Sequence, residues 1–105
     1  MALNNVNALL SDINDYLHIT WNDEKTNKNI TGMINRGMSR LNNIAGVPEL
    51  DFMKEELPRQ LLFDYVRYAN AQALEMFEKN FQSELLNLYY DYQEKTVVLD
   101  ENNYT

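Results

Sequence analysis

The chain has 105 residues, a length that suits one domain with its own core and is too short for two. Apolar residues make up 45% of it, with only 3 glycines and 2 prolines, which argues against both a disordered chain and a turn-rich β-sandwich and favours helices. Sixteen acidic against nine basic residues give a net charge of -7, which repels a phosphate backbone and argues against general nucleic-acid binding.

The chain contains no cysteine, which removes disulfides, thiolate metal sites and a thiol nucleophile from consideration. No apolar run approaches the roughly 20 residues that cross a bilayer. Residues 1–10 lack the basic start and the apolar core of a signal peptide. We therefore expect a cytosolic protein where it is made, with no membrane partner.

The first predicted helix covers residues 6–17, where apolar side chains recur every three or four positions and line one face. Alternatively, Ser11 caps a shorter helix. The segment 19–22 interrupts the pattern. Trp21, within it, is either an exposed anchor for a partner or a side chain that folds back onto the core, and the sequence leaves both open.

The second predicted helix begins after Asn22, because Asn followed by Asp23 and Glu24 is typical of a cap with acids in the first turn. Its apolar residues between 30 and 45 fall on one face, so the helix is amphipathic. Gly46, with a proline two residues later, predicts its end.

The third predicted helix begins near Glu55, with Pro58 tolerated in its first turn, and its pattern continues as far as Phe81. Apolar residues cover about two-thirds of its circumference. Two other helices of modest length are too few to cover such a helix. We therefore expect a neighbouring chain to cover part of the segment 57–81.

Asn80 is predicted to interrupt this helix, and Ser83 with Glu84 to restart it. The restarted segment is rich in tyrosine, which is enriched in protein interfaces because it combines a large apolar ring with a polar tip. The prediction is a helical domain over 1–93 and a flexible tail over 94–105. The predicted fold class is all-α, a small bundle of three to four helices with a long central helix and a flexible C-terminal tail.

The sequence offers little for catalysis. His18 is the only histidine, and with Asp12 and Asp15 it forms a series in steps of three. Each such step drifts about 60° around a helix, so the side chains diverge, and His18 is interpreted as a helix-end residue. No glycine-rich phosphate loop is present. We predict no catalytic residue, no metal and no cofactor, and a protein that is not an enzyme.

Three stretches carry a resemblance to a known family, and they are Leu17-His18-Ile19-Thr20-Trp21-Asn22-Asp23-Glu24, Leu61-Leu62-Phe63-Asp64-Tyr65-Val66-Arg67-Tyr68 and Phe77-Glu78-Lys79-Asn80. In this order, and over about residues 11–90, the chain resembles the head-to-tail connector proteins of long-tailed bacteriophages. These are also called adaptor or DNA-packaging connector proteins. The chain is most similar to the versions from phages and prophages of Gram-positive bacteria.

The resemblance implies a helical bundle that assembles as a ring, commonly a dodecamer, between the portal and the tail. It implies contacts with other copies, with the portal protein and with head-completion or tail proteins, while DNA passes through without sequence-specific binding. The location implied is the head-tail junction of the virion, and the host cytoplasm during assembly. The family's C-terminal segment grips the portal, a role that we carry to Leu85, Leu88, Tyr89 and Tyr92.

Subunits in a ring meet head to tail, so two different surfaces of each chain must complement each other. The candidates for this subunit interface are Arg36, Arg40 and Arg67 on one side and Asp64, Glu75 and Glu78 on the other.

A second class of function is a small acidic helical inhibitor or regulatory protein that binds a host protein, for example at an enzyme's DNA site. The net charge of -7 is compatible with such an inhibitor. A DNA mimic needs regularly spaced acids on an exposed surface, whereas here arginines and lysines are interspersed among them.

Overall fold

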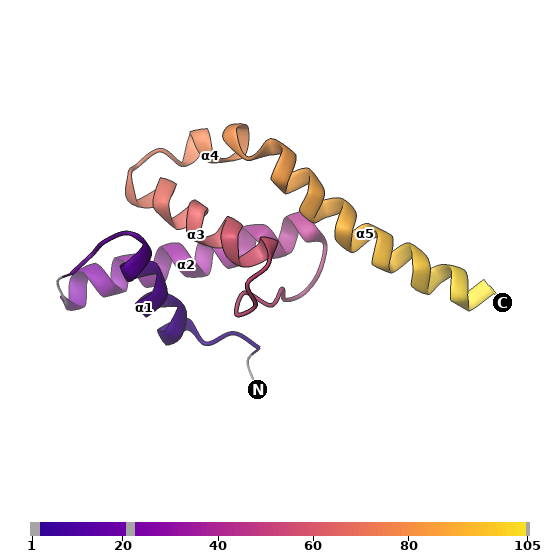
Figure 1. Cartoon of the computed structure of the whole chain (residues 1–105), viewed down its shortest axis with the longest axis horizontal. Helices are drawn as coiled ribbons and strands as arrows, with labels where there is room; N and C mark the ends of the chain where they lie inside the picture. The colour runs from indigo at the N-terminus through magenta and orange to yellow at the C-terminus, as the bar shows by residue number, and fades with distance from the viewer. Residues whose placement is uncertain (1–2, 21–22, 105) are drawn as a thin grey trace.

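The computed structural model describes residues 3–20 and 23–104, with side chains described as far as residue 93. Within these ranges the chain forms helices and no strand, and the helices are α1 (Val6–Tyr16), α2 (Glu24–Ala45), α3 (Leu57–Asn70), α4 (Leu74–Asn80) and α5 (Gln82–Tyr104). In Figure 1, α2 and α3 lie alongside each other, α1 packs near the start of α2, and α4 returns above α3. The predicted all-α class is confirmed.

Helix α1 is capped at its start by a side-chain hydrogen bond, and a left-handed residue follows its end. The side chain of Asn5 caps its start, because Asn5 Oδ1 accepts a hydrogen bond of 3.1 Å from the backbone N–H of Ala8. Ser11 lies inside the helix and does not cap a shorter one. His18 follows the last turn with φ at 60°, a left-handed conformation that ends helices.

Helix α2 starts from Asp23, one residue later than predicted. Asp23 Oδ2 accepts hydrogen bonds from the backbone N–H of Thr26 at 3.0 Å and from its hydroxyl at 2.9 Å. These bonds, the one from the hydroxyl above all, lower the pKa of Asp23. The predicted cap Asn22 and the neighbouring Trp21 lie outside the described residues. Gly46 ends the helix as predicted, with φ at 74°.

The connection 47–56 is held against the bundle by Asn4, a residue that the sequence did not single out. The Asn4 amide donates to the carbonyl of Leu50 at 2.8 Å and accepts from the backbone N–H of Phe52 at 2.7 Å. Asn42 Oδ1 accepts from the N–H of Leu50, also at 2.8 Å. These bonds pin the connection at two points, so the side chains of Leu50 and Phe52 are buried.

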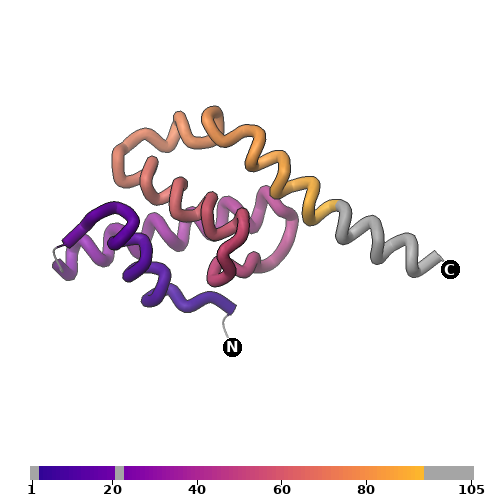
Figure 2. The backbone as a smooth tube through the Cα atoms, viewed as in Figure 1, coloured from indigo at the N-terminus to yellow at the C-terminus, as the bar shows by residue number. Residues whose placement is uncertain are grey.

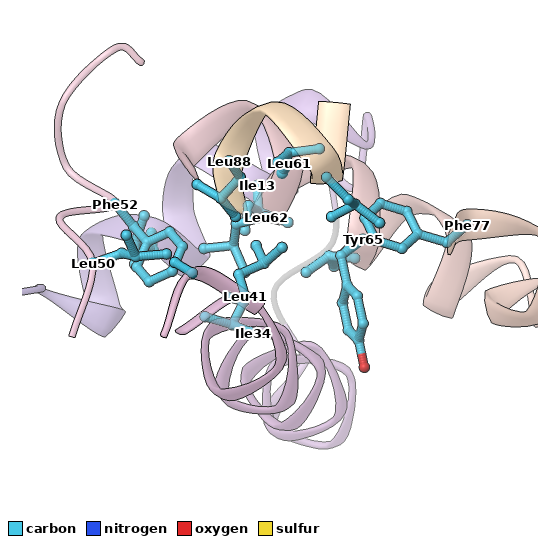
Figure 3. Packing of buried hydrophobic residues seen from close by; sticks show 14 of the residues in the cluster. Ile13, Ile34, Leu41, Leu50, Phe52, Leu61, Leu62, Tyr65, Phe77 and Leu88 are labelled. Carbon is cyan, nitrogen blue, oxygen red and sulfur yellow. The ribbon is translucent and has the colours of Figure 1, made fainter. Parts of the chain in front are cut away.

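The core extends along the α2–α3 pair. Figure 3 shows Leu50 and Phe52 at one end of it and Tyr65 and Phe77 at the other. Gly37 lets α2 and α3 approach closely, because a Cβ at this position would lie 2.7 Å from Cδ1 of Tyr65. The sequence had placed Gly37 on the apolar face, and the structure supplies the reason.

The predicted long central helix is broken between α3 and α4, so that expectation was wrong. Gln72 takes a left-handed conformation with φ at 58°, and the N–H of Ala73 donates back to the carbonyl of Tyr68 at 2.9 Å. Figure 2 shows the chain running one way along α3 and returning through α4 and α5. The predicted interruption at Asn80 is confirmed, because α4 ends there and α5 starts at Gln82.

The turn between α3 and α4 is stabilised by aromatic contacts between the two helices. It brings Phe77 onto the side of α3, where its ring centroid lies 5.5 Å from Tyr65 and 5.9 Å from Tyr68. Phe81 stacks on Phe77 at 5.2 Å and meets Tyr68 edge-on at 5.6 Å. Such ring pairs add stabilisation of about 0.5–1.5 kcal/mol each beyond the burial of their area.

The segment 57–81 is therefore covered largely by its own chain. Leu61, Leu62 and Val66 are completely buried, and Met76, at 41%, is the one large hydrophobic residue of this segment that is exposed. The reason given for expecting a neighbouring chain does not hold, because it assumed one straight helix. The broken helix folds its apolar surface onto itself. That a neighbouring chain covers part of the segment stays a prediction.

The predicted boundary at residue 94 falls inside α5. The side chains of 94–105 lie outside the described part of the chain, so the division into a domain and a tail remains a prediction.

Candidate interaction surfaces

Two of the predicted interface charges, Arg40 and Glu78, pair with each other within one chain. Arg40 Nε and Nη2 donate to the two carboxylate oxygens of Glu78, at 2.9 and 2.7 Å, and tie α2 to α4. The hydrogen bonds from Arg40 lower the pKa of Glu78, although partial burial opposes them. The structure places these charges together and not on opposite sides of the subunit as predicted, because the α3–α4 turn brings Glu78 back over α2.

Asp64 and Arg67 also lie together, in contrast to the predicted arrangement. Asp64 Oδ1 accepts from the hydroxyl of Tyr16 at 2.7 Å and from Arg67 Nη2 at 3.4 Å. The residue is only 7% exposed, because α1 packs over it. Partial burial first, and then the Asp64 carboxylate, raise the pKa of Tyr16. Asp64 thus joins α1 to α3 and is not a freely accessible interface charge.

Arg36 and Glu75, the other two predicted interface charges, stay predictions, and the structure shows only that they lie at the surface. Both are exposed, Arg36 on α2 and Glu75 in the first turn of α4. Among the described residues, neither forms an ion pair. They remain accessible to a partner.

The four predicted portal contacts divide into core and surface. Leu88 is completely buried and Leu85 is 8% exposed, because α5 packs this face against the bundle, so these two are core residues in this conformation. Tyr92 is half-buried, and its pKa is raised by burial first and then by neighbouring acids, Glu56 foremost. Tyr89 is 41% exposed and is the predicted contact that faces solvent most openly.

Within residues 82–93, the part of α5 whose side chains are described, the large exposed apolar side chains lie on one stripe. We call this stripe the α5 ridge and define it as Leu86, Tyr89 and Tyr90. They are 47%, 41% and 56% exposed. Their spacing of three and four places them on one side of the helix, and the rings of Tyr89 and Tyr90 meet at 5.3 Å. Together they form an aromatic surface of the kind that partners bind.

A hollow of about 610 Å³ lies beside the ridge, between α2, α4 and α5. Ile44 and Leu85 supply part of its apolar lining, along with Leu86 and Tyr89 of the ridge. The charged side chains at this hollow are those of Arg40, Glu78 and Lys79. Basic groups outnumber acids here, in a protein whose net charge is strongly negative.

A second groove, which we call the α1–α3 groove, has a volume of about 660 Å³ and opens on different elements. Its lining includes apolar and aromatic side chains from α1 and α3 and acids from the end of the connection 47–56. Among the residues that line the groove are Tyr16, Glu55, Glu56, Gln60, Phe63 and Asp64. The rings of Tyr16 and Phe63 lie 5.6 Å apart.

Arg59 is the one basic residue that lines the α1–α3 groove, and its charge is already engaged. Its side chain is 11% exposed, pairs with Asp12 at 2.7 Å and Glu55 at 3.3 Å, and stacks over Phe63 at 4.6 Å. Glu56 forms no ion pair within the described part of the chain. The groove is thus aromatic inside and acidic at its edge.

Other chemistry is sparse across the described residues. They contain no group of three or more histidine, aspartate or glutamate side chains placed to hold a metal ion. No helix within the same residues is long and apolar enough to span a membrane. His18 is exposed just beyond the end of α1, which agrees with its interpretation as a helix-end residue.

Several residues of these surfaces were not predicted. Leu86 and Tyr90 belonged to the apolar run of the last helix, but the sequence did not show which of its side chains point outward. Tyr16 was expected only as part of the apolar face of the first helix, and Lys79 only as part of the resembling stretch. Their places at these surfaces depend on the packing of α1 and on the α3–α4 turn. Glu55, four residues before Arg59, was the one local hint of the ion pair at the groove.

Comparison of the chain with models of protein families, with curated proteins and with solved structures finds no match.

Proposed function

We propose that this chain is a structural protein of a long-tailed bacteriophage virion, which forms a ring between the portal and the tail. The ring gives DNA a passage and the tail a platform for attachment. Its partners are further copies of the chain, the portal protein, and head-completion or tail proteins. The resemblance in the order of three sequence stretches supports this proposal, and the all-helical fold agrees with it.

The observation that carries the proposal is the α5 ridge. Two tyrosines and a leucine that are exposed side by side on one helix are typical of a surface that binds another chain. Tyrosine at such a position supplies a large contact area and a hydroxyl that remains hydrated or finds a partner. The function proposed is therefore binding, not catalysis.

The charge of the chain suits a DNA passage. With a net charge of -7, a ring of copies presents walls that repel the duplex and let it slide without grip. The protein acts at the head-tail junction of the virion and is present in the host cytoplasm during assembly. The portal contact is assigned to α5 from Ser83 onward, with Tyr89 as its exposed member.

Size-exclusion chromatography with light scattering tests the proposal. The mass of the wild-type protein is expected to rise from monomer to a large assembly as its concentration increases. A variant with Tyr89→Ser and Tyr90→Ser is expected to stay small, whereas Leu3→Ser, at a residue 49% exposed but outside the ridge, is expected to assemble as the wild type does.

A wild-type protein that stays monomeric at every concentration, with and without a portal protein, contradicts the proposal. If the same monomer formed a tight one-to-one complex with a host DNA-binding enzyme, the result would favour the acidic inhibitor instead.

A further inference from the structure

The α5 ridge and the α1–α3 groove complement each other. We propose that the ridge of one copy seats in the α1–α3 groove of the next copy, an inference that rests on the proposed function because it names the partner of the same ridge. An exposed helix stripe laid into a groove is a common mode of recognition. This groove combines the rings of Tyr16 and Phe63 with polar and charged side chains. The two surfaces share no residue and no helix, since one is built on α5 and the other on α1, α3 and the end of the connection before it.

The α5 ridge and the α1–α3 groove match in shape and chemistry. The ridge projects aromatic rings, with Tyr90 the most exposed at 56%. The groove offers the rings of Tyr16 and Phe63, 5.6 Å apart, within a volume of about 660 Å³. A volume in this range accommodates a buried tyrosine side chain, and aromatic rings favour offset or edge-on contact with each other.

The two surfaces also carry opposite local charges. Lys79 and Arg40 line the hollow beside the ridge, and basic groups are in excess there. Glu55 and Glu56 line the α1–α3 groove, where acids are in excess even after Arg59 is counted. Because copies with a net charge of -7 repel one another on average, opposite local charges are needed to orient them.

The two acids of α5 within residues 82–93 leave the charge match of the two surfaces unchanged. Glu84 and Asp91 lie on the side of α5 away from the ridge by the helical repeat. Within residues 82–93, where the side chains of α5 are described, the ridge therefore has no acidic side chain on its own face, and its basic neighbours match the acidic groove.

The geometry has a consequence for assembly. Two different surfaces that bind each other are heterologous, so each copy can bind one neighbour on either side and the series closes into a ring when the rotation allows. A contact between two ridges, or between two grooves, would give only a dimer. The contact also reassigns Tyr89 from the portal to the neighbouring subunit.

Disulfide cross-linking tests the contact directly, and the chain suits it because it has no cysteine of its own. Tyr90→Cys puts a single thiol on the ridge and Gln60→Cys puts one at the α1–α3 groove, both at exposed positions. When the two full-length variants are mixed and oxidised, the expected product is a covalent dimer that contains one copy of each. Each variant alone is expected to give at least about tenfold less dimer, because like surfaces do not meet.

Ser39→Cys is the matched control, since it is exposed on α2 and belongs to neither surface. Mixed with Tyr90→Cys, it is expected to stay uncross-linked. A charge swap provides a second measurement. Lys79→Glu and Glu56→Lys are each expected to weaken self-association by roughly tenfold in sedimentation velocity, and combining them is expected to restore it.

Cross-linking of Tyr90→Cys with itself as efficiently as with Gln60→Cys overturns the inference. So does the absence of the mixed dimer from a wild-type-like assembly, and in that case the proposed ring survives and only this contact fails. A wild-type chain that never assembles overturns both.

Discussion

Arg40 and Glu78 join α2 to α4 through two hydrogen bonds of 2.9 and 2.7 Å. They are 38 residues apart in the sequence and meet because the chain reverses direction after α3. The pair thus bridges the two sides of the reversal at the edge of the hollow beside the α5 ridge.

Glu78→Gln is expected to lower the free energy of unfolding by less than about 1 kcal/mol at pH 7, because both side chains are near half-exposed and the pair is screened. Arg40 lowers the pKa of Glu78 below its ordinary 4.5. The contribution of the carboxylate is therefore complete above about pH 4.5 and is lost as the pH falls through the lowered pKa. Urea unfolding at pH 7 and at a series of falling pH values below 4.5 measures this, and a difference between wild type and variant that does not shrink along the series contradicts it.

Gly37→Ala is expected to destabilise the protein by about 1–3 kcal/mol, because the new Cβ would lie 2.7 Å from Tyr65 Cδ1 and 2.8 Å from Leu62 Cδ1. Gly32→Ala in the same helix is the control, where the Cβ meets only the flexible end of Arg36, at 3.2 Å. It is expected to stabilise by about 0.5–1 kcal/mol through helix propensity. Urea unfolding of both variants checks the opposite signs, and equal signs would refute the close approach of α2 and α3.

Gln72→Gly is expected to stabilise the protein by up to about 1 kcal/mol, because glycine adopts the left-handed conformation at φ 58° without the cost that a side chain incurs. If 57–81 were instead one continuous helix, the same change would destabilise by about 1 kcal/mol. The sign of the shift in thermal midpoint separates the two structures. Gln72→Ala, which keeps a Cβ, serves as the control and is expected to show no gain.

Tyr16→Phe is expected to cost about 1 kcal/mol at pH 7, because it removes the 2.7 Å hydrogen bond to the buried Asp64 carboxylate while Tyr16 itself is 42% exposed. The pKa of Tyr16 is raised above its ordinary 10.0. Its contribution is therefore complete below about pH 10 and is lost as the pH rises through the raised pKa. Thermal unfolding at pH 7 and at a series of rising pH values above 10 checks this, since the gap in stability between variant and wild type must shrink along the series.

The parts of the fold that were predicted correctly are those governed by local sequence. The amphipathic stripe of α2, its end at Gly46 and the interruption at Asn80 each depend on neighbouring residues alone. The turn at Gln72 was missed because Ala-Gln-Ala consists of good helix formers. The turn is favoured by Phe77 packing on Tyr65, a tertiary contact that outweighs local propensity.

The candidate surfaces were harder to predict for the same reason. The interface charges were placed on two sides of a straight helix, and the fold paired Arg40 with Glu78 and Arg67 with Asp64. The importance of the last helix as an aromatic segment was foreseen, but burial of Leu88 and exposure of Tyr90 depend on how α5 lies against α2. The α1–α3 groove could not be predicted, because it forms only when α1 docks on α3.

The measurement that tests the account most directly is native mass spectrometry of the concentrated wild-type chain, which counts the subunits of each species. If the chain forms a ring, a single closed species with a fixed number of copies is expected to accumulate as the concentration rises, because a closed ring leaves no ridge or groove unoccupied. A protein that shows only monomers and dimers under these conditions, or an open-ended series of sizes, contradicts it.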